Sequence, residues 1–347
     1  MLDIFNNDAF SVNALTAAIN LLPYKPRRIG AMKLFEVKNP RTHTVIIERK
    51  DNRLAILESK PRNSGETNKR APTRRDMVPI MIPYIPLDDA ILASDLQGVR
   101  EFDTEDQLET VSGITNEKMQ SLRDNHEVTH EWHRLGAIKG QILDGDESFS
   151  QLLDLFDVFN ITQEEVEFDI ADPTSTNLKL ACADTIGLIE EALGGLMYDH
   201  VHALVGNDFF QSIVNHPAVV GAYTAANHPQ NAFKVEQQGA YGTMGRGSNQ
   251  VWFGDILFEN YRGKVAGKNF VELDEAHIFP VGVPGLFQTH FGPANTISAV
   301  NKPGQPISVM QETMKFDAGI ELHSESNPLC ICTMPEVLIK GTITPLS

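Results

Sequence analysis

The sequence predicts an α+β fold in which an extended hairpin and a long amphipathic helix precede a strand-rich C-terminal half. Residues 31–85 hold β-branched strands with little apolar sequence to cover them. Residues 104–143 keep a helical period, and from Val251 onward short strands alternate with Gly and Pro turns. With 347 residues, 41 % of them hydrophobic, the chain is long enough to bury the cores of two or three domains.

The first 30 residues are predicted to form an arm. A short helical pattern covers residues 10–19, and the prolines in residues 22–26 favour an extended path. Charge is distributed unevenly along the chain. Residues 1–80 hold 15 Lys or Arg against 8 Asp or Glu, a net charge of +7, whereas residues 81–347 hold 14 against 38, a net charge of −24.

This charge distribution restricts the function classes. An acidic body repels duplex phosphate, so a typical nucleic-acid-binding protein is excluded. The basic segment is either a solvated surface or an arm that lies on the acidic body of a neighbouring copy. Charge alone leaves both interpretations open.

The extended hairpin occupies residues 31–85. Residues 42–48 and 54–57 are predicted strands joined by a turn at residues 50–53, and a third strand at residues 77–85 contains prolines that restrict it to a sheet edge. A lone two-stranded ribbon is marginal in water, so it must find a partner surface. Its basic side chains are the candidate inter-subunit contacts: Arg49, Lys50, Arg53, Lys69, Arg70, Arg74 and Arg75.

A long helix is predicted over about residues 105–143, opened by a capping box at Thr104 and Gln107. Its final ~30 residues alone span about 45 Å at ~1.5 Å per residue. One face is apolar and packs, while the other is solvated. The apolar face comprises Leu108, Val111, Ile114, Met119, Leu122, Trp132, Leu135 and Leu143.

The region after this helix alternates strands and helices. A strand is expected near residues 168–170, and a helix at about 178–193 that Gly194 and Gly195 end. A strand at residues 201–205 and a helix opened by Asn207 follow.

A possible metal motif lies inside the long helix. His126, Glu127 and His130 match H-E-x-x-H, in which two histidines on one helix face bind zinc and the glutamate acts as general base. Glu147 or Asp154 would have to supply a third ligand. Histidines that border an apolar stripe are more often packed and hydrogen-bonded, so structural histidines are the favoured interpretation, with a zinc site and a pH-responsive contact as alternatives.

The remaining motifs indicate structure. Glycine-rich residues 239–247 lack the G-K-[ST] of a phosphate loop and are predicted to be flexible, and Ser324 is predicted to lie on a strand or turn surface. Gly136 and Gly140 allow close backbone packing. No catalytic, cofactor-binding or metal residue is therefore expected. Buried reduced thiols are predicted for Cys182, Cys330 and Cys332.

Three groups of residues occur in the order found in a known family. They are Leu22-Pro23-Tyr24-Lys25-Pro26-Arg27-Arg28-Ile29 with Leu34-Phe35 and Thr44-Val45 before Ile47-Glu48; Thr129 and Glu131 with Gly136-Ala137-Ile138-Lys139-Gly140 and Ile142-Leu143-Asp144; and Pro335-Glu336-Val337-Leu338-Ile339-Lys340-Gly341-Thr342-Ile343. Together they resemble the phage major capsid protein E family, the lambda-like coat proteins of the HK97 fold. The resemblance covers nearly the whole chain.

The resemblance implies an HK97-like capsid fold and a structural subunit that is not an enzyme. Its parts would be an N-terminal arm at residues 1–30, an E-loop at 31–85, a P domain with the spine helix at 86–172, an A domain at 173–312, and C-terminal strands at 313–347 that return to the P and A domains. Such subunits self-assemble into hexamers and pentamers that form the icosahedral head of a tailed bacteriophage.

The resemblance also implies partners. A portal protein is expected. A separate scaffolding protein is also expected, because no long charged helix precedes the arm as a fused scaffolding domain. A decoration protein occurs in lambda-like relatives, but the sequence does not specify one. The shell would enclose double-stranded DNA without binding it specifically. Neither a membrane-spanning run nor a secretory signal is visible, so we expect assembly in the host bacterial cytoplasm and a final place in the virion.

Overall fold

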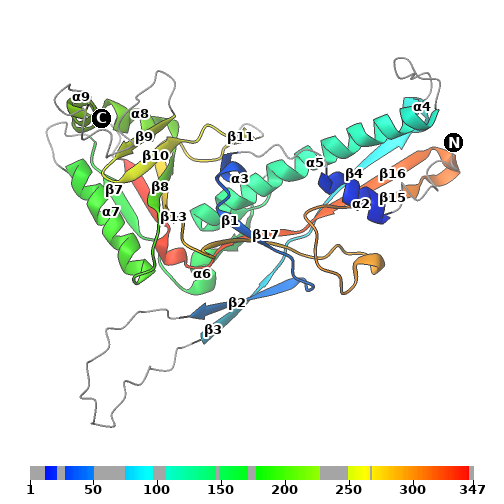
Figure 1. Ribbon diagram of the computed structural model, residues 1–347, viewed down its shortest axis with the longest axis horizontal. Coiled ribbons are helices and arrows are strands. Elements are labelled where there is room, and N and C mark those ends of the chain that lie inside the picture. The colour runs from blue at the N-terminus through cyan, green and yellow to red at the C-terminus, as the bar shows by residue number, and fades with distance from the viewer. Residues whose placement is uncertain are drawn as a thin grey trace, which may run out of the picture.

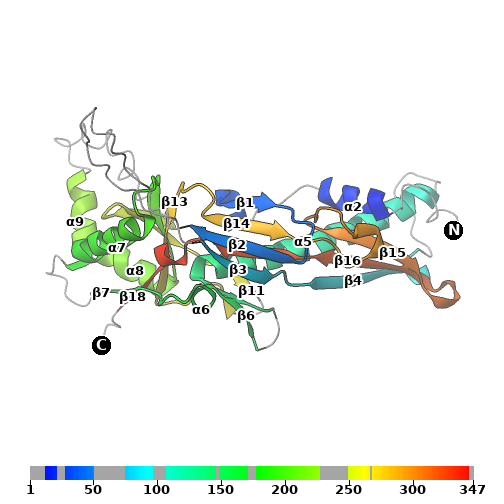
Figure 2. The same cartoon turned by 90° about the horizontal axis from the view of Figure 1, so that it is seen from below.

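The computed structural model describes residues 12–21, 28–50, 75–96, 107–145, 148–170, 177–226, 249–265 and 268–343. A mixed sheet with helices lies at one end of this elongated molecule, and a smaller sheet lies beside a long helix at the other (Figure 1). A two-stranded ribbon projects from the middle (Figure 1). Figure 2 shows the smaller sheet running along the long axis. Helices and strands are thus both present, as the predicted α+β class requires.

The mixed sheet has the strand order β7-β18-β13-β8-β10-β9. These strands are β7 (Glu165–Phe168), β8 (His200–Val205), β9 (Gln250–Phe253), β10 (Ile256–Asn260), β13 (Glu275–Val281) and β18 (Ile339–Ile343). Beside them lie α7 (Asn177–Leu193), α8 (Asn207–Asn215) and α9 (Pro217–Ala226). Helix α7 ends as predicted, because Gly194 and Gly195 adopt positive φ angles of 60° and 96°. The strand predicted at residues 168–170 lies slightly earlier, in β7.

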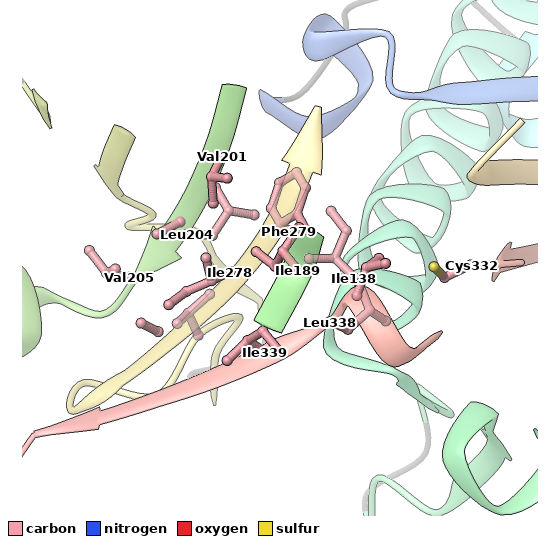
Figure 3. Close-up of a cluster of buried hydrophobic side chains, with 14 of the residues drawn as sticks. Ile138, Ile189, Val201, Leu204, Val205, Ile278, Phe279, Cys332, Leu338 and Ile339 are labelled. Atoms are coloured by element: carbon pink, nitrogen blue, oxygen red, sulfur yellow. The ribbon is translucent and has the colours of Figure 1, made fainter. Parts of the chain in front are cut away.

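The main core joins this sheet to the long helix α5 (Gln107–Lys139). Figure 3 shows Val201 of β8, Phe279 of β13, Ile189 of α7 and Ile138 of α5 within one cluster. Each of these four side chains is at most 1 % exposed. Burying such a side chain contributes about 1.5–3 kcal/mol, so the helix end and the sheet stabilise each other.

Helix α5 has 33 residues and spans about 50 Å at ~1.5 Å per residue. The prediction that it continues to Leu143 is wrong. Gly140 has a φ of 83°, and a Cβ atom there would lie 2.1 Å from Cε2 of Phe156, so the chain leaves the helix and turns back as β5 (Gln141–Leu143). Thr104 of the predicted capping box lies outside the described residues.

The smaller sheet, with the order β15-β16-β4, packs beside α5. It contains β15 (Ser308–Thr313), β16 (Gly319–Ser326) and β4 (Ile85–Leu92), which continues into α4 (Ala93–Leu96). Helix α2 (Val12–Leu21) lies against β15, where Thr16 Oγ1 bonds both the carbonyl and the amide of Val309. A second apolar cluster joins Leu15 and Ile19 of α2 to Met119 and Leu122 of α5. The predicted helical pattern at residues 10–19 thus gives a helix where it is described, and this helix continues to Leu21.

The ribbon consists of β2 (Thr44–Lys50) and β3 (Arg75–Met81), paired antiparallel from Thr44↔Met81 to Lys50↔Arg75. The predicted turn at residues 50–53 is therefore wrong at its start, because Lys50 still pairs within the ribbon. The partner strand of β2 is β3 and not residues 54–57, which lie outside the described residues. The expectation that the ribbon lacks a core is also wrong at its base: buried side chains there are Val45, Ile47, Ile80 and Ile82.

A third sheet, β1-β14-β17, places β17 against α5. The remaining elements are short. They are α3 (Arg28–Met32), β1 (Phe35–Lys38), β6 (Gln151–Asp154), α6 (Leu155–Phe159), β11 (Lys264–Val265), β12 (Lys268–Asn269), β14 (Phe287–Phe291), β17 (Pro328–Cys332), and 3-10 turns at Ile297–Ala299, Lys315–Asp317 and Pro335–Val337. None of the described helices is long and apolar enough to span a membrane.

Candidate assembly surfaces and the histidine row

The histidines of the metal-like motif form a buried row between α5 and β16. His126 and His130 are 2 % and 1 % exposed. Nε2 of His126 lies 3.0 Å from Oγ of Ser324, and Nε2 of His130 lies 2.6 Å from Oγ of Ser326. The prediction that Ser324 lies on a strand or turn surface is therefore wrong in its exposure, since this strand residue is fully buried.

The hydrogen bonds of the two serines fix the role of each ring nitrogen. Ser324 donates its hydroxyl proton to the carbonyl of Leu87, and Ser326 donates to the carbonyl of Pro306. A hydroxyl has one proton, so each serine accepts from the histidine. Nε2 of His126 and of His130 therefore carries a proton, and no lone pair on Nε2 is free for a metal ion.

The charge state of the row follows from its burial. Burial, together with the nearby His130, lowers the pKa of His126 to about 4. Burial also lowers the pKa of His133 to about 4 and lowers the pKa of His130. All three histidines are thus neutral at pH 7, and two of them, His126 and His130, join the helix to β16 through the serine hydroxyls.

The other candidate zinc residues have structural roles. Glu127 lies 3.9 Å from Arg123 and 3.8 Å from Nδ1 of His130. Asp154 caps α6 by accepting from the amides of Phe156 and Asp157. Glu147 lies outside the described residues, among which no group of three or more His, Cys, Asp or Glu side chains could hold a metal ion. The geometry therefore supports the structural interpretation of this motif.

The other motifs agree with structural roles where they are described. All three cysteines are free and buried, as predicted, and burial raises the pKa of Cys182 to about 12. A Cβ atom at Gly136 would lie 2.9 Å from Cα of Ile142, which is the close packing expected for this glycine. Residues 239–247 lie outside the described residues.

Glu131 of α5 binds the start of α3, the short helix that follows the arm. Its carboxylate, 1 % exposed, accepts hydrogen bonds from the amides of Ile29 at 2.7 Å and Gly30 at 3.1 Å. The hydroxyl of Tyr261 donates to the same carboxylate at 3.1 Å. The negative charge is thus satisfied at the first turn of α3, where unpaired amides attract it.

Arg28 joins the same short helix to the mixed sheet. Its guanidinium makes a bidentate ion pair with Glu259 of β10. His202 and Gln250 also contact that carboxylate, at 3.1 Å and 2.9 Å. Burial alone would raise the pKa of Glu259, but the hydrogen bonds from His202 and Arg28 lower it to about 2. Sequence reasoning missed this network, although Glu131 belongs to the T-x-E pattern quoted for the family.

The predicted basic contact residues gather at the far end of the ribbon where they are described. Lys50 pairs with Arg75, and Arg49 with Asp76, as backbone partners at that end. Arg53, Lys69, Arg70 and Arg74 lie outside the described residues.

The ribbon base presents apolar surface. Ile46 and Met81 are 61 % and 77 % exposed. Met81 also lines an open groove of about 420 Å³, together with Tyr84 and Leu152. Exposed apolar surface of this kind marks an interaction site.

Comparison with known proteins identifies the family. The family model described as phage major capsid protein E matches residues 11–343. The major capsid protein of Salmonella phage Felix O1 is 24 % identical, with 98 % of each chain covered, and that of Pseudomonas phage KPP10 is 26 % identical, with 96 % of each covered. In a structure of the bacteriophage PhiM1 mature capsid, a chain with 12 % identity superposes with a TM-score of 0.50 over 94 % of this chain and 89 % of that one.

These matches confirm the predicted HK97-type fold and give no support to a zinc hydrolase. The chain belongs to the phage major capsid protein E family and is a structural subunit of a phage capsid shell, not an enzyme.

Proposed function

We propose that this subunit assembles into hexamers and pentamers, which close the icosahedral head of a tailed phage around double-stranded DNA. The observation that carries this proposal is the ribbon. Its base is anchored in the subunit's own core by Val45 and Ile80, while Ile46 and Met81 face outward without cover. A second copy that covers this surface would bury apolar area at about 25 cal/mol per Å².

In this proposal the chain divides as the resemblance implies. Residues 1–30 are the arm, 31–85 the E-loop, 86–172 the P domain with the spine helix, 173–312 the A domain, and 313–347 the returning strands. The separation of the ribbon, the smaller sheet beside α5 and the mixed sheet along the molecule supports three such parts (Figure 1), although β7 of the P domain pairs in the mixed sheet and β15 pairs in the smaller one.

The basic end of the ribbon would lie on the acidic body of the next subunit. Arg49, Lys50, Arg53, Lys69, Arg70, Arg74 and Arg75 are the proposed contacts. Exposed carboxylates suited to receive them occur on and beside β7 and on α7, for example Glu164, Glu165, Glu190 and Glu191. Complementary charge orients the subunits, and apolar burial supplies most of the attraction.

The proposed partners are a scaffolding protein, a portal protein and, where the phage has one, a decoration protein. Assembly would take place in the host bacterial cytoplasm before the shell becomes part of the virion. The net charge of −24 over residues 81–347 supports enclosure of DNA without specific binding, because such a body repels phosphate.

The test replaces the distal part of the ribbon. Deleting residues 42–76 would also remove Val45 and Ile47 from the core. A more specific variant keeps both strands and replaces residues 51–74 by an Asn-Gly turn that joins β2 to β3. We expect a folded, soluble subunit that does not form shells in electron microscopy, whereas the intact chain, with scaffolding protein if required, does. Normal shells from the shortened chain would refute the role of the ribbon.

A further inference from the structure

The turn between β15 and β16 carries an aromatic side chain that the subunit does not use. Phe316 is 100 % exposed. Its backbone lies in the left-handed region, with φ 63° and ψ 27°, which disfavours residues other than glycine. Neither the exposure nor the conformation stabilises the subunit, and exposed aromatic residues are typical anchors of protein interfaces.

A pocket of matching size lies at the other end of β15. It has a volume of about 280 Å³ between α2, residues 294–305 and β15, and its lining includes Ala17, Ala299 and Met310. Beside it, Ile297 and Val300 are 95 % and 63 % exposed. A cavity of ~150 Å³ is enough for benzene, so this pocket can hold a phenylalanine ring.

The charges of the two surfaces are complementary. Glu312 and Glu321 are exposed and directly opposite each other on the paired strands β15 and β16. Like charges at opposed positions repel, so this pair favours a nearby cation. The pocket supplies one, because Lys302 is exposed and lines it.

A subunit cannot fill its own pocket with its own tip. Ser308 and Met310 at the start of β15 line the pocket, whereas Phe316 lies beyond the end of the strand. The six residues of β15 from Ser308 to Thr313 span roughly 17 Å. Figures 1 and 2 show that this hairpin lies at the end of the molecule remote from the mixed sheet.

We propose that Phe316 of one subunit inserts into the pocket beside Ile297 of a second copy, with Lys302 of that copy facing Glu312 and Glu321. Tip and pocket are different surfaces, so the contact is heterologous and closes into a ring when the rotation allows. The contact would thus join subunits through the ends that lie remote from the mixed sheet. This inference rests on the proposed shell function and names the contact that completes it.

The first test removes the aromatic ring. F316A should raise the protein concentration needed for assembly on the order of tenfold, as loss of an interface anchor does. M197A is the matched control, because Met197 is also strongly exposed, at 85 %, but lies on the loop after α7. Equal assembly of F316A, M197A and the unchanged protein overturns this inference but leaves the shell function standing. An unchanged protein that forms no shells, with scaffold supplied, overturns both.

The second test exchanges the charges. K302E and E321K should each weaken assembly, and the double variant should recover most of it, because the opposite charges face each other again. If the losses of assembly in the two single variants simply add in the double variant, the proposed pairing of Lys302 with Glu321 is contradicted.

The third test locates the contact. Under oxidising conditions, assembled F316C/A299C should form a disulfide between subunits, while F316C/L152C, which targets the groove at the ribbon base, should not. The native cysteines are buried and do not compete. Cross-linking of the control pair alone, or of neither pair in assembled shells, would overturn the assignment.

Discussion

The carboxylate of Glu131 accepts a hydrogen bond of 2.7 Å from the backbone amide of Ile29, although 102 residues separate them in the sequence. This contact holds the start of α3, and with it the chain that leads into the ribbon, against the long helix. It also explains why a buried glutamate lies in the middle of a packed helix.

Replacing Glu131 by Ala should therefore loosen this connection. Two amides and the hydroxyl of Tyr261 lose their acceptor, which should lower the free energy of unfolding by about 2–4 kcal/mol. Hydrogen exchange of the peptide that contains Ile29 and Gly30 should become faster. Unchanged exchange in that peptide would show that the contact does not hold α3.

Arg28 provides a second prediction. Arg28→Ala leaves the carboxylate of Glu259, a residue only 5 % exposed, without its strongest partner. We expect a loss of about 1–3 kcal/mol, discounted because the arginine is partly exposed, and partial recovery when Glu259→Gln is added. Lys118→Ala is the control: its partner Asp89, at 3.0 Å, has a side chain 28 % exposed against 7 % for Glu259, so this ion pair should contribute less than about 1 kcal/mol. Equal losses of unfolding free energy in both variants would contradict a stronger contribution from the Arg28–Glu259 ion pair.

The histidine row predicts a pH dependence. The pKa values of His126 and His133 are lowered to about 4 in the folded protein, from an ordinary value of 6.5. The unfolded chain therefore binds protons first as pH falls, so stability is full above pH 6.5 and is lost between about 6.5 and 4, on the order of 3 kcal/mol for His126. His277 and His290 shift in the same direction.

Denaturant unfolding from pH 7.5 to 4.5 measures this effect. His126→Gln should flatten the pH dependence, because the amide does not titrate. Glu259 and Glu275, with pKa values of about 2, lose stability only at lower pH. A protein whose stability is constant from pH 7.5 to 4.5 would contradict the neutral, buried row.

The tight packing at Gly140 predicts the effect of adding a side chain where α5 ends. Gly140→Ala forces a side chain into a positive φ and against the ring of Phe156, which should destabilise the subunit by about 2–4 kcal/mol. Gly187→Ala, on the exposed side of α7 with nothing within 4 Å of the added Cβ, should instead stabilise it by about 0.5–1 kcal/mol. Thermal unfolding distinguishes the two, and equal transition temperatures would contradict the tight packing at Gly140.

Local pattern predicted the elements whose signals are local. Helix α7 has an apolar period and a Gly-Gly stop, and β8 is a short apolar run, so both were predicted to within one residue. The end of α5 was missed, because Leu143 continues the apolar period and Gly140, which has a φ of 83° where the helix ends, was interpreted only as a packing glycine. The ribbon partner was also missed, since β2 pairs with a strand more than 20 residues away.

In the candidate site, too, local features could be predicted from the sequence and contacts between distant residues could not. Buried, hydrogen-bonded histidines followed from their place beside the apolar stripe, but their serine partners are on β16, almost 200 residues away. Arg28, Glu131 and Glu259 come from three separate parts of the chain, and no local pattern links them. Phe316 and Ile297 look like ordinary core residues in the sequence, because exposure depends on the fold.

The central claim is that the ribbon is completed by another copy of the chain. Electron microscopy of the full-length protein beside the variant with residues 51–74 replaced by Asn-Gly tests it most directly. We predict closed shells from the first and only folded, unassembled subunits from the second. Shells of the same size and yield from both proteins would contradict it.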